Sequence, residues 1–156
     1  MDSQIIDRRV FNQQTILLVE DNEDEVFIIR NVFKKAAVAN PLHVACDGEQ
    51  AIGYLSGEGS YSDRQKFPLP VIVLMDLNMP KKNGLEVLKW IREHPSLSTL
   101  TVHLLTASNR PSDIEVAAQL GANAYLIKPG KIEELLEIVK AWATVSSFAA
   151  YPALRA

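Results

Sequence analysis

Short apolar runs alternate along this chain with segments whose apolar residues recur at helical spacing. Five of the runs have the length and composition of parallel strands that are covered on both faces. They occupy residues 15–20 (TILLVE), 42–46 (LHVAC), 71–76 (VIVLMD), 101–106 (TVHLLT) and 124–128 (AYLIK). Most of these runs end at a polar or charged residue, which is unusual for a buried strand and marks the strand ends for closer study.

The segments that follow the strands predict helices. Val26, Ile29 and Phe33 share one face of a helix within residues 24–37. The last helix spans residues 131–144, and its apolar face consists of Ile132, Leu135, Leu136 and Val139. The fourth helix spans residues 111–120 and is closed by a glycine.

Two helices begin with the residue pattern of a capping box. Asp47 is followed by Gln50, and Asn83 by Glu86, each at the spacing at which the two side chains cap the helix start. His94–Pro95 ends the second of these helices, because the residue before a proline avoids helical geometry.

A strand followed by a helix, repeated five times, predicts a parallel sheet with helices on both faces and right-handed crossovers. We expect a single α/β domain over residues 15–144, with an N-terminal arm at residues 1–14 and a C-terminal tail at residues 145–156. The connection at residues 56–70 is long for such a domain, which points to a specific role.

Composition and charge exclude several classes of protein. The chain has 156 residues and a net charge of −3, so a general electrostatic grip on nucleic acid or anionic membrane is not expected. No apolar run approaches the ~20 residues needed to span a bilayer. Cys46 is the single cysteine, which favours a reducing, cytoplasmic compartment, and we expect it to be a small buried residue at a strand end.

Other polar residues are expected to have ordinary roles. The three histidines, His43, His94 and His103, lie on separate elements without metal-ligand spacing. Lys81–Lys82 is expected to be a solvated pair in a loop.

The strand ends carry the candidate chemistry. In open α/β sheets, ligands bind outside the carboxyl ends of the strands, where the strand order switches. The residues at these ends are Glu20 and Asp21, Asp76, Thr106 and Lys128. Three neighbouring carboxylates repel one another, and Mg²⁺ would relieve this because it prefers oxygen ligands. Together with a lysine and a hydroxyl, such a site suits a phosphoryl group carried by Asp76 as an aspartyl phosphate.

Each of these residues also has an ordinary explanation. Acids at strand ends are most often helix caps or turn residues, a lone lysine is usually solvated, and a threonine is a common strand terminus. Because four of the five strand ends carry the required group, in the required order, coincidence is a weak explanation for the set.

The motifs VEDNEDE (residues 19–25), MDLNMPKKNG (75–84), LLTAS (104–108) and YLIKP (125–129) together resemble the receiver domain of two-component response regulators. Each motif falls at the end of its own strand, and the resemblance covers nearly all of residues 15–144. It implies a flavodoxin-like (βα)5 fold with strand order 2-1-3-4-5.

The resemblance assigns roles in phosphorylation. It implies that Asp76 is the phosphoacceptor, charged by a histidine kinase, and that the chain catalyses only its own phosphoryl acceptance and slow autodephosphorylation. It further implies that Asp21 binds Mg²⁺ directly and that Glu20 does so through water. The backbone carbonyl of Asn78 would be a further metal ligand.

The resemblance also implies a switch. Thr106 and the backbone amide of Ala107 would hydrogen-bond the phosphoryl group. Lys128 would pair with a phosphoryl oxygen, in a loop set by a cis bond to Pro129. Tyr125 would be an aromatic switch that turns inward when Thr106 moves toward the phosphate.

A narrower resemblance is to the small response regulators paired with cyanobacterial phytochromes. It is carried by the connection at 56–70, the PKKNG run, the apolar C-terminal tail and the expected lack of an output domain. It implies a phytochrome-type kinase, and a homodimer through the fourth helix, the fifth strand, the last helix and the tail. Trp142, Phe148 and Tyr151 are candidates for the dimer patch, with core filling or a frayed tail as the equal alternative.

The chain departs from the family pattern at two places. Glu20–Asp21 stands where many receivers have Asp-Asp, which keeps the charge. Gly130 stands where many have Phe, so an apolar anchor is missing and the coupling of the pocket to the dimer surface is left open.

Three other functions remain as alternatives. An aspartyl-nucleophile phosphatase of the haloacid dehalogenase type needs a second Asp where this chain has Asn78, and a cap domain. A flavin or nucleotide binder needs a phosphate loop rich in Gly or Ser/Thr, but residues 20–24 are EDNED. A receiver-like module that binds partners without phosphorylation is disfavoured by the complete site but stays open.

Overall fold

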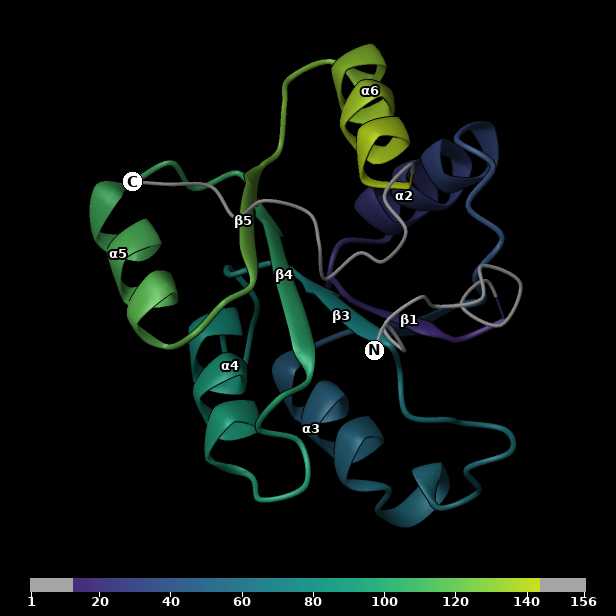
Figure 1. Ribbon diagram of the computed structural model, residues 1–156, viewed down its shortest axis with the longest axis vertical. Coiled ribbons are helices and arrows are strands. Elements are labelled where there is room, and N and C mark those ends of the chain that lie inside the picture. The colour runs from purple at the N-terminus through teal and green to yellow at the C-terminus, as the bar shows by residue number, and fades with distance from the viewer. Residues whose placement is uncertain (1–12, 144–156) are drawn as a thin grey trace, which may run out of the picture.

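Five parallel strands form one sheet in the order β2-β1-β3-β4-β5 in a computed structural model that describes residues 13–143 (Figure 1). The strands are β1 (Ile16–Val19), β2 (Leu42–Ala45), β3 (Ile72–Met75), β4 (Thr101–Thr106) and β5 (Ala124–Ile127). This confirms the predicted strand order. β1 lies between β2 and β3, because Ile16 is aligned with Leu42 on one side and with Ile72 on the other.

Helices cover both faces of the sheet, as expected for a flavodoxin-like fold (Figure 1). The helical elements are α2 (Glu23–Lys35), α3 (Gly48–Ser56), the 3₁₀ turn η1 (Gly59–Tyr61), α4 (Gly84–Glu93), α5 (Pro111–Gln119) and α6 (Ile132–Ala143). α2 and α6 pack on one face, and α3, α4 and α5 on the other.

Alternate residues of each central strand enter different halves of the core, because successive side chains point to opposite faces. The half under α3 and α4 receives Leu17, Val19, Val73 and Met75. The half under α2 and α6 receives Ile16, Leu18, Ile72 and Leu74. Both faces of these strands are therefore buried, which explains why the sequence shows continuous apolar runs instead of alternation.

The helix starts follow the capping patterns with one difference. Asn83 and Glu86 form a complete capping box at the start of α4. Asp47 caps α3 by accepting from the Gln50 amide at 2.8 Å, but the Gln50 side chain accepts from the Cys46 amide at 2.9 Å and not from Asp47. Both N-caps are thus confirmed, whereas the second half of the predicted box at Asp47 is wrong.

Two residues expected in the core are exposed. Cys46 lies on the surface, because the chain has already left β2 and turns outward into α3. Ile132 is 51% exposed, since the first turn of α6 lies beside Phe27 of α2, itself 69% exposed. Leu135 and Val139 of the same helix are buried as predicted.

The long connection before β3 is organised by one arginine. Arg64 Nη1 donates to the carbonyls of Tyr54 at 2.7 Å and Phe67 at 3.1 Å, and Nη2 to that of Leu55 at 2.8 Å. Two of these carbonyls belong to the last turn of α3, where intrahelical donors run out. The Tyr54 hydroxyl donates to the Pro68 carbonyl at 2.8 Å, and burial raises the pKa of Tyr54 to about 12.

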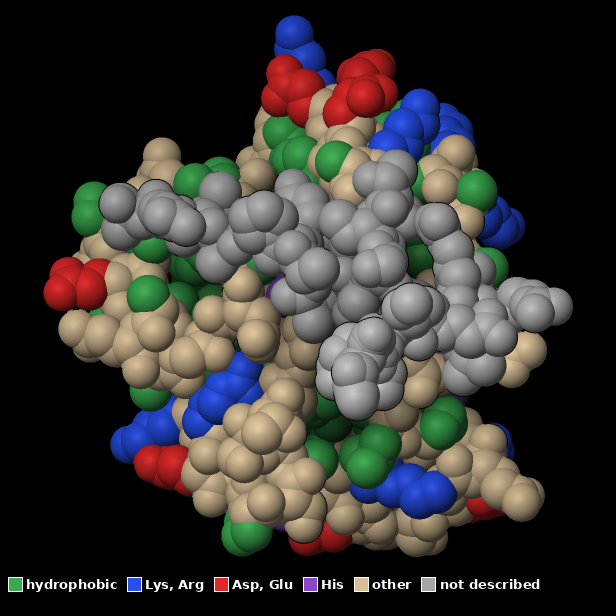
Figure 2. Space-filling model, viewed as in Figure 1, with side chains coloured by type: hydrophobic (Ala, Val, Ile, Leu, Met, Phe, Trp, Pro, Cys, Tyr) green, Lys and Arg blue, Asp and Glu red, His purple; other side chains and the backbone are tan. Residues whose placement is uncertain are grey.

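The surface carries charges of both signs (Figure 2). Acidic side chains gather at the top of that view, where Figure 1 places α6, whose first turn contains Glu133 and Glu134. No helix within residues 13–143 is long and apolar enough to cross a membrane. The candidate dimer residues Phe148 and Tyr151, and the side chain of Trp142, lie outside the part of the chain that the structure describes.

Candidate functional site

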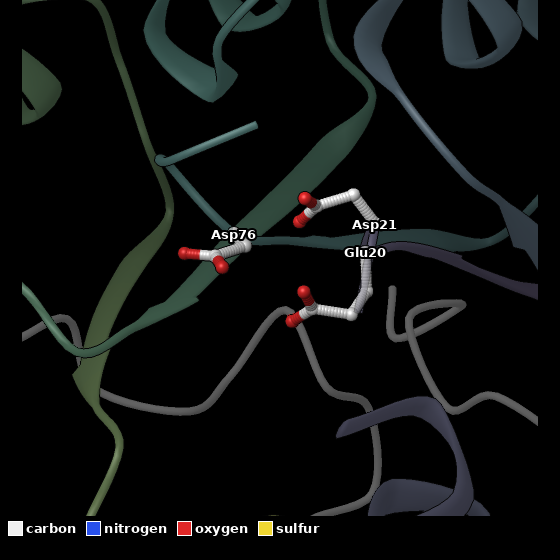
Figure 3. A group of neighbouring side chains, drawn as sticks. All are labelled: Glu20, Asp21 and Asp76. Atoms are coloured by element: carbon white, nitrogen blue, oxygen red, sulfur yellow. The ribbon is translucent and has the colours of Figure 1, made fainter. Parts of the chain in front are cut away.

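Three carboxylates meet at the carboxyl ends of β1 and β3. The sheet order reverses here, because β2 lies on one side of β1 and β3 on the other. Glu20 and Asp21 follow β1 directly, and Asp76 follows β3. Figure 3 shows the side chains of Glu20 and Asp21 leaving the end of β1 in opposite directions, with both carboxylates turned toward Asp76. The site lies at the switch point where open α/β sheets bind ligands.

The three acids are close enough to share one ion. One carboxylate oxygen from each of Glu20, Asp21 and Asp76 lies within 4.8 Å of the other two. Glu20 is buried, Asp76 is half-buried and Asp21 is exposed. Burial and the charge of Asp76 raise the pKa of Glu20, and its hydrogen bond to Lys128 offsets this only in part.

Lys128 brings a positive charge into the cluster from the end of β5. Its Nζ donates to Glu20 Oε1 at 2.8 Å and to Asp76 Oδ2 at 3.4 Å, and lies 3.5 Å from Glu25 Oε2. Burial alone would lower the pKa of Lys128, but the hydrogen bond to Glu20 and the surrounding acids outweigh burial and raise it. The pKa of Glu20 therefore rises chiefly because its carboxylate is buried, whereas that of Lys128 rises because acids surround it.

A divalent cation fits this cluster. An octahedral Mg²⁺ takes oxygen ligands at 2.0–2.1 Å, so opposite ligand oxygens stand about 4.2 Å apart. The three carboxylate oxygens, which lie within 4.8 Å of one another, are close to this spacing. An added positive charge would also offset the excess negative charge, and the donor set is the hard oxygen set that Mg²⁺ prefers.

The loop after β3 contributes Asn78. Its side chain is exposed, and its backbone amide lies 3.4 Å from Asp76 Oδ1. The sequence-based prediction makes the Asn78 carbonyl a metal ligand, and the loop places this residue beside Asp76, as that role requires.

Thr106 and Lys128 leave neighbouring strands side by side. The Lys128 amide donates to the Thr106 carbonyl at 2.7 Å. Thr106 is fully buried, its Oγ1 accepts from the Ser108 amide at 3.3 Å, and Ala107 between them is exposed. The hydroxyl predicted to meet a phosphoryl group therefore belongs to the same edge of the sheet as the acids.

The peptide bond between Lys128 and Pro129 was expected to be cis and is trans. Trans is the lower-energy isomer of an X–Pro bond, and it already allows Lys128 to reach both Glu20 and Asp76. After Pro129, Gly130 faces open space, because an added Cβ there would meet nothing within 4 Å.

Tyr125 occupies a buried position under the β4–α5 connection. It is 3% exposed and its hydroxyl donates to the Ser108 carbonyl at 2.9 Å. Burial raises the pKa of Tyr125. Tyr125 thus points inward in this structure, and its predicted movement with Thr106 stays a prediction.

Two contacts of the site were not predicted from the sequence. Glu25 reaches Lys128 because Asn22 caps α2, accepting from the amides of Asp24 at 2.9 Å and Glu25 at 3.2 Å. Ser108 Oγ donates to Asp113 Oδ2 at 2.6 Å. The N-cap signal at Asn22 is visible in the sequence and could have indicated that the first turn of α2 lies over the acids.

Comparison with known proteins decides the family. A family model described as the response regulator receiver domain matches residues 16–140. The chain belongs to the response regulator receiver domain family. The fold, the strand order and the acidic cluster described above are those of a receiver domain.

This receiver domain resembles response regulators of phytochrome systems. Response regulator Rcp1 of Synechocystis sp. (strain ATCC 27184 / PCC 6803 / Kazusa) is 34% identical over 127 residues, which cover 81% of this chain and 84% of Rcp1. A crystal structure of the Mn(2+)-bound form of Rcp1 superimposes with a TM-score of 0.77 at 31% identity, covering 92% of this chain and 99% of the other.

Two further crystal structures are similar at 34% identity. Response regulator RPA3017, in red light signaling of R. palustris, has a TM-score of 0.81 and covers 90% of this receiver domain and 99% of its own chain. The phosphorylated cyanobacterial phytochrome response regulator RcpA has a TM-score of 0.76, with 83% and 90% covered. The receiver domain is thus related to phytochrome response regulators.

Proposed function

We propose that this receiver domain accepts a phosphoryl group on Asp76 from a histidine kinase, with Mg²⁺ bound at the acidic cluster. The observation that carries the proposal is the convergence of three carboxylates and one lysine at a single strand edge. The oxygens of Glu20, Asp21 and Asp76 lie within 4.8 Å of one another, and Lys128 Nζ lies 3.4 Å from Asp76.

The residues that would hold Mg²⁺ are Asp21 and Asp76 directly, Glu20 through water and the backbone carbonyl of Asn78. When bound, Mg²⁺ neutralises charge on the phosphoryl oxygens during transfer. Support for a divalent cation comes from the oxygen-rich cluster and from the relative Rcp1, whose structure is described as Mn(2+)-bound.

In the transfer step, one Oδ of Asp76 attacks the phosphorus of a phosphohistidine on the kinase. The O–P bond forms while the P–N bond breaks, and the electron pair of that bond stays on the imidazole, which then takes up a proton from water. Lys128 donates to a phosphoryl oxygen, and the Thr106 hydroxyl and the Ala107 amide donate to the others. Asp76 is half-buried and therefore accessible to a donor residue of another protein.

The output is a change at the surface formed by α5, β5 and α6. Movement of Thr106 toward the phosphoryl group would break its contact with Ser108 and displace the connection that leads into α5. Val116 on α5 and Ile127 on β5 are 40% and 37% exposed, so this surface has apolar side chains to offer to a second copy or another partner. We propose a homodimer here, with the C-terminal tail contributing.

The kinase is proposed to be of the phytochrome type. RcpA, which is 34% identical, is described as a cyanobacterial phytochrome response regulator. The single cysteine of the chain agrees with the cytoplasm as the compartment where the two proteins meet.

The test is intact-mass analysis after incubation with acetyl phosphate and Mg²⁺. We expect the wild type to gain one phosphoryl group, and we expect the gain to be lost in Asp76→Asn and in EDTA. Gel filtration of the same samples would reveal a change in self-association. A wild type that gains no phosphoryl group under conditions that label other receivers would overturn the proposal in favour of a phosphorylation-independent interaction module.

A further inference from the structure

The loop between β3 and α4, residues 77–83, carries Asn78 and is closed at its base. The Gly84 amide donates to the Leu77 carbonyl at 2.9 Å, which brings the two ends of the loop together. A Cβ at Gly84 would overlap the Asp76 carbonyl and stand 2.9 Å from Leu77 Cα, so glycine permits this closure. The base of the loop is therefore fixed from within the loop itself.

The tip of the loop is held from outside, by the first residue of α3. Gly48 is buried against Lys82: a Cβ there would overlap the Lys82 carbonyl oxygen and lie 2.7 Å from Lys82 Cβ. The φ angle of Gly48 is not in the left-handed region, so its backbone would accept any residue. Only the close approach of Lys82 requires a glycine at this position.

A second contact ties the same two segments. Asp47 Oδ2 lies 3.5 Å from Lys81 Nζ, while Asp47 Oδ1 caps α3. Lys81 has a φ of 67°, a conformation that β-branched residues strongly disfavour. The end of β2, which leads into this turn, is also joined to the acidic cluster, because the Glu20 amide donates to the Ala45 carbonyl at 3.0 Å.

We propose that Gly48 is a positioning residue for the metal site. By leaving room for Lys82 it seats the tip of the loop against α3, and this holds the Asn78 carbonyl where a cation bound by Asp21 and Asp76 needs it. The inference rests on the proposed function, because it states how one ligand of that same site is placed. It adds a residue that touches neither metal nor phosphoryl group.

The test compares Gly48→Ala with Gly53→Ala in the same helix. A Cβ at Gly53 would make an ordinary contact, 3.5 Å from Tyr61 Cδ2, so this variant controls for the added methyl group. Mn²⁺ titrations followed by electron paramagnetic resonance measure the Kd, and urea unfolding measures stability. We expect Gly48→Ala to bind Mn²⁺ about tenfold more weakly, the low end for loss of support around a metal ligand, and Gly53→Ala to bind as the wild type does.

Equal Mn²⁺ affinities in the two glycine variants would overturn the inference, whatever the urea midpoints show. A wild type that does not bind Mn²⁺ would instead contradict the proposed function. The two failures are therefore distinguishable within one titration series.

A second pair of variants decides the question if Gly48→Ala does not fold. Lys81→Gly keeps the positive φ of the exposed loop tip, whereas Lys81→Val opposes it, and both remove the same charge. We expect Lys81→Val to bind Mn²⁺ about tenfold more weakly than Lys81→Gly, again from loss of support around a ligand. Equal affinities in this pair would show that the loop tip does not position the site.

Discussion

The Tyr125 hydroxyl donates a hydrogen bond to the Ser108 carbonyl at 2.9 Å, which joins β5 to the connection after β4. The Ser108 amide in turn donates to Thr106 Oγ1 at 3.3 Å, and the Ser108 hydroxyl donates to Asp113 at the start of α5. A displacement of Thr106 would therefore move Ser108 and, through its hydrogen bonds, Tyr125 and Asp113. This chain of contacts gives the proposed switch a physical route from the pocket to α5 and β5.

Tyr125→Phe removes the first of these contacts. The Ser108 carbonyl loses its partly buried donor, so we expect the free energy of unfolding to fall by about 1 kcal/mol. Labelling of Asp76 by acetyl phosphate should proceed at the wild-type rate, because the hydroxyl does not touch the acids. Urea unfolding and intact-mass labelling measure the two effects. Tyr61→Phe at η1 is the control for loss of a hydroxyl, and an equal loss of stability there would contradict the assignment.

We expect the effect of Glu20→Gln on the free energy of unfolding to have opposite signs without and with a bound metal ion. The pKa of Glu20 is raised chiefly by burial, so the ionised carboxylate costs folding energy as the pH rises through that pKa. At neutral pH in EDTA, the variant should therefore be at least as stable as the wild type.

In Mg²⁺, the wild type should be more stable than the Glu20→Gln variant. At a concentration 100 times its Kd, a bound ion stabilises the wild type by about 2.7 kcal/mol, and the variant should gain less because it has lost a ligand charge. Thermal unfolding in EDTA and in Mg²⁺ provides the comparison. A variant that is less stable than the wild type in EDTA would show that the Glu20–Lys128 pair, at 2.8 Å, outweighs burial.

Lys128→Met should separate metal binding from phosphoryl transfer. Removal of the positive charge leaves the three carboxylates uncompensated, so Mn²⁺ should bind several-fold more tightly. The labelling of Asp76 at saturating metal should slow by about 100-fold, since one donor to the phosphoryl oxygens is gone.

Lys131→Met, an exposed position three residues further along, is the matched control and should leave both quantities unchanged. Weaker Mn²⁺ binding in Lys128→Met would contradict this prediction. It would mean that Lys128 positions the carboxylates and that this effect on Mn²⁺ affinity exceeds the repulsion between its charge and the ion.

The site residues were predictable because each one follows an apolar run, and the parallel sheet brings all the carboxyl ends to one edge. Glu20, Asp21, Asp76 and Lys128 therefore came together as the sequence indicated. Their chemical roles remain predictions until phosphorylation and metal binding are measured.

The contacts that the sequence did not reveal are those made across the fold by long or small side chains. Arg92 on α4 donates to the Gly121 carbonyl at 2.8 Å and to Asn123 Oδ1 at 2.9 Å, and both residues lie far along the chain from α4. The sequence identifies Gly48 only as part of a helix start. A glycine is required there because Lys82, in another loop, leaves no room for a Cβ. Periodicity locates elements, but it does not report which loops meet.

His103 gives a pH-dependent test of the core. It is fully buried in β4, and burial lowers its pKa to about 4. The unfolded chain takes up a proton at this residue near pH 6.5. Because the folded chain stays neutral until about pH 4, acid favours the unfolded chain between these values, and the stability is lost as the pH falls through this window.

The measurement is urea unfolding of the wild type and His103→Gln at pH 7 and pH 5. The wild type should lose about 2 kcal/mol more than the variant between the two values, because the variant lacks the His103 imidazole, which the unfolded state protonates preferentially. Comparing each protein with itself cancels the packing change caused by the substitution. If His103→Gln and the wild type lose the same stability, His103 is protonated in the folded chain at pH 5.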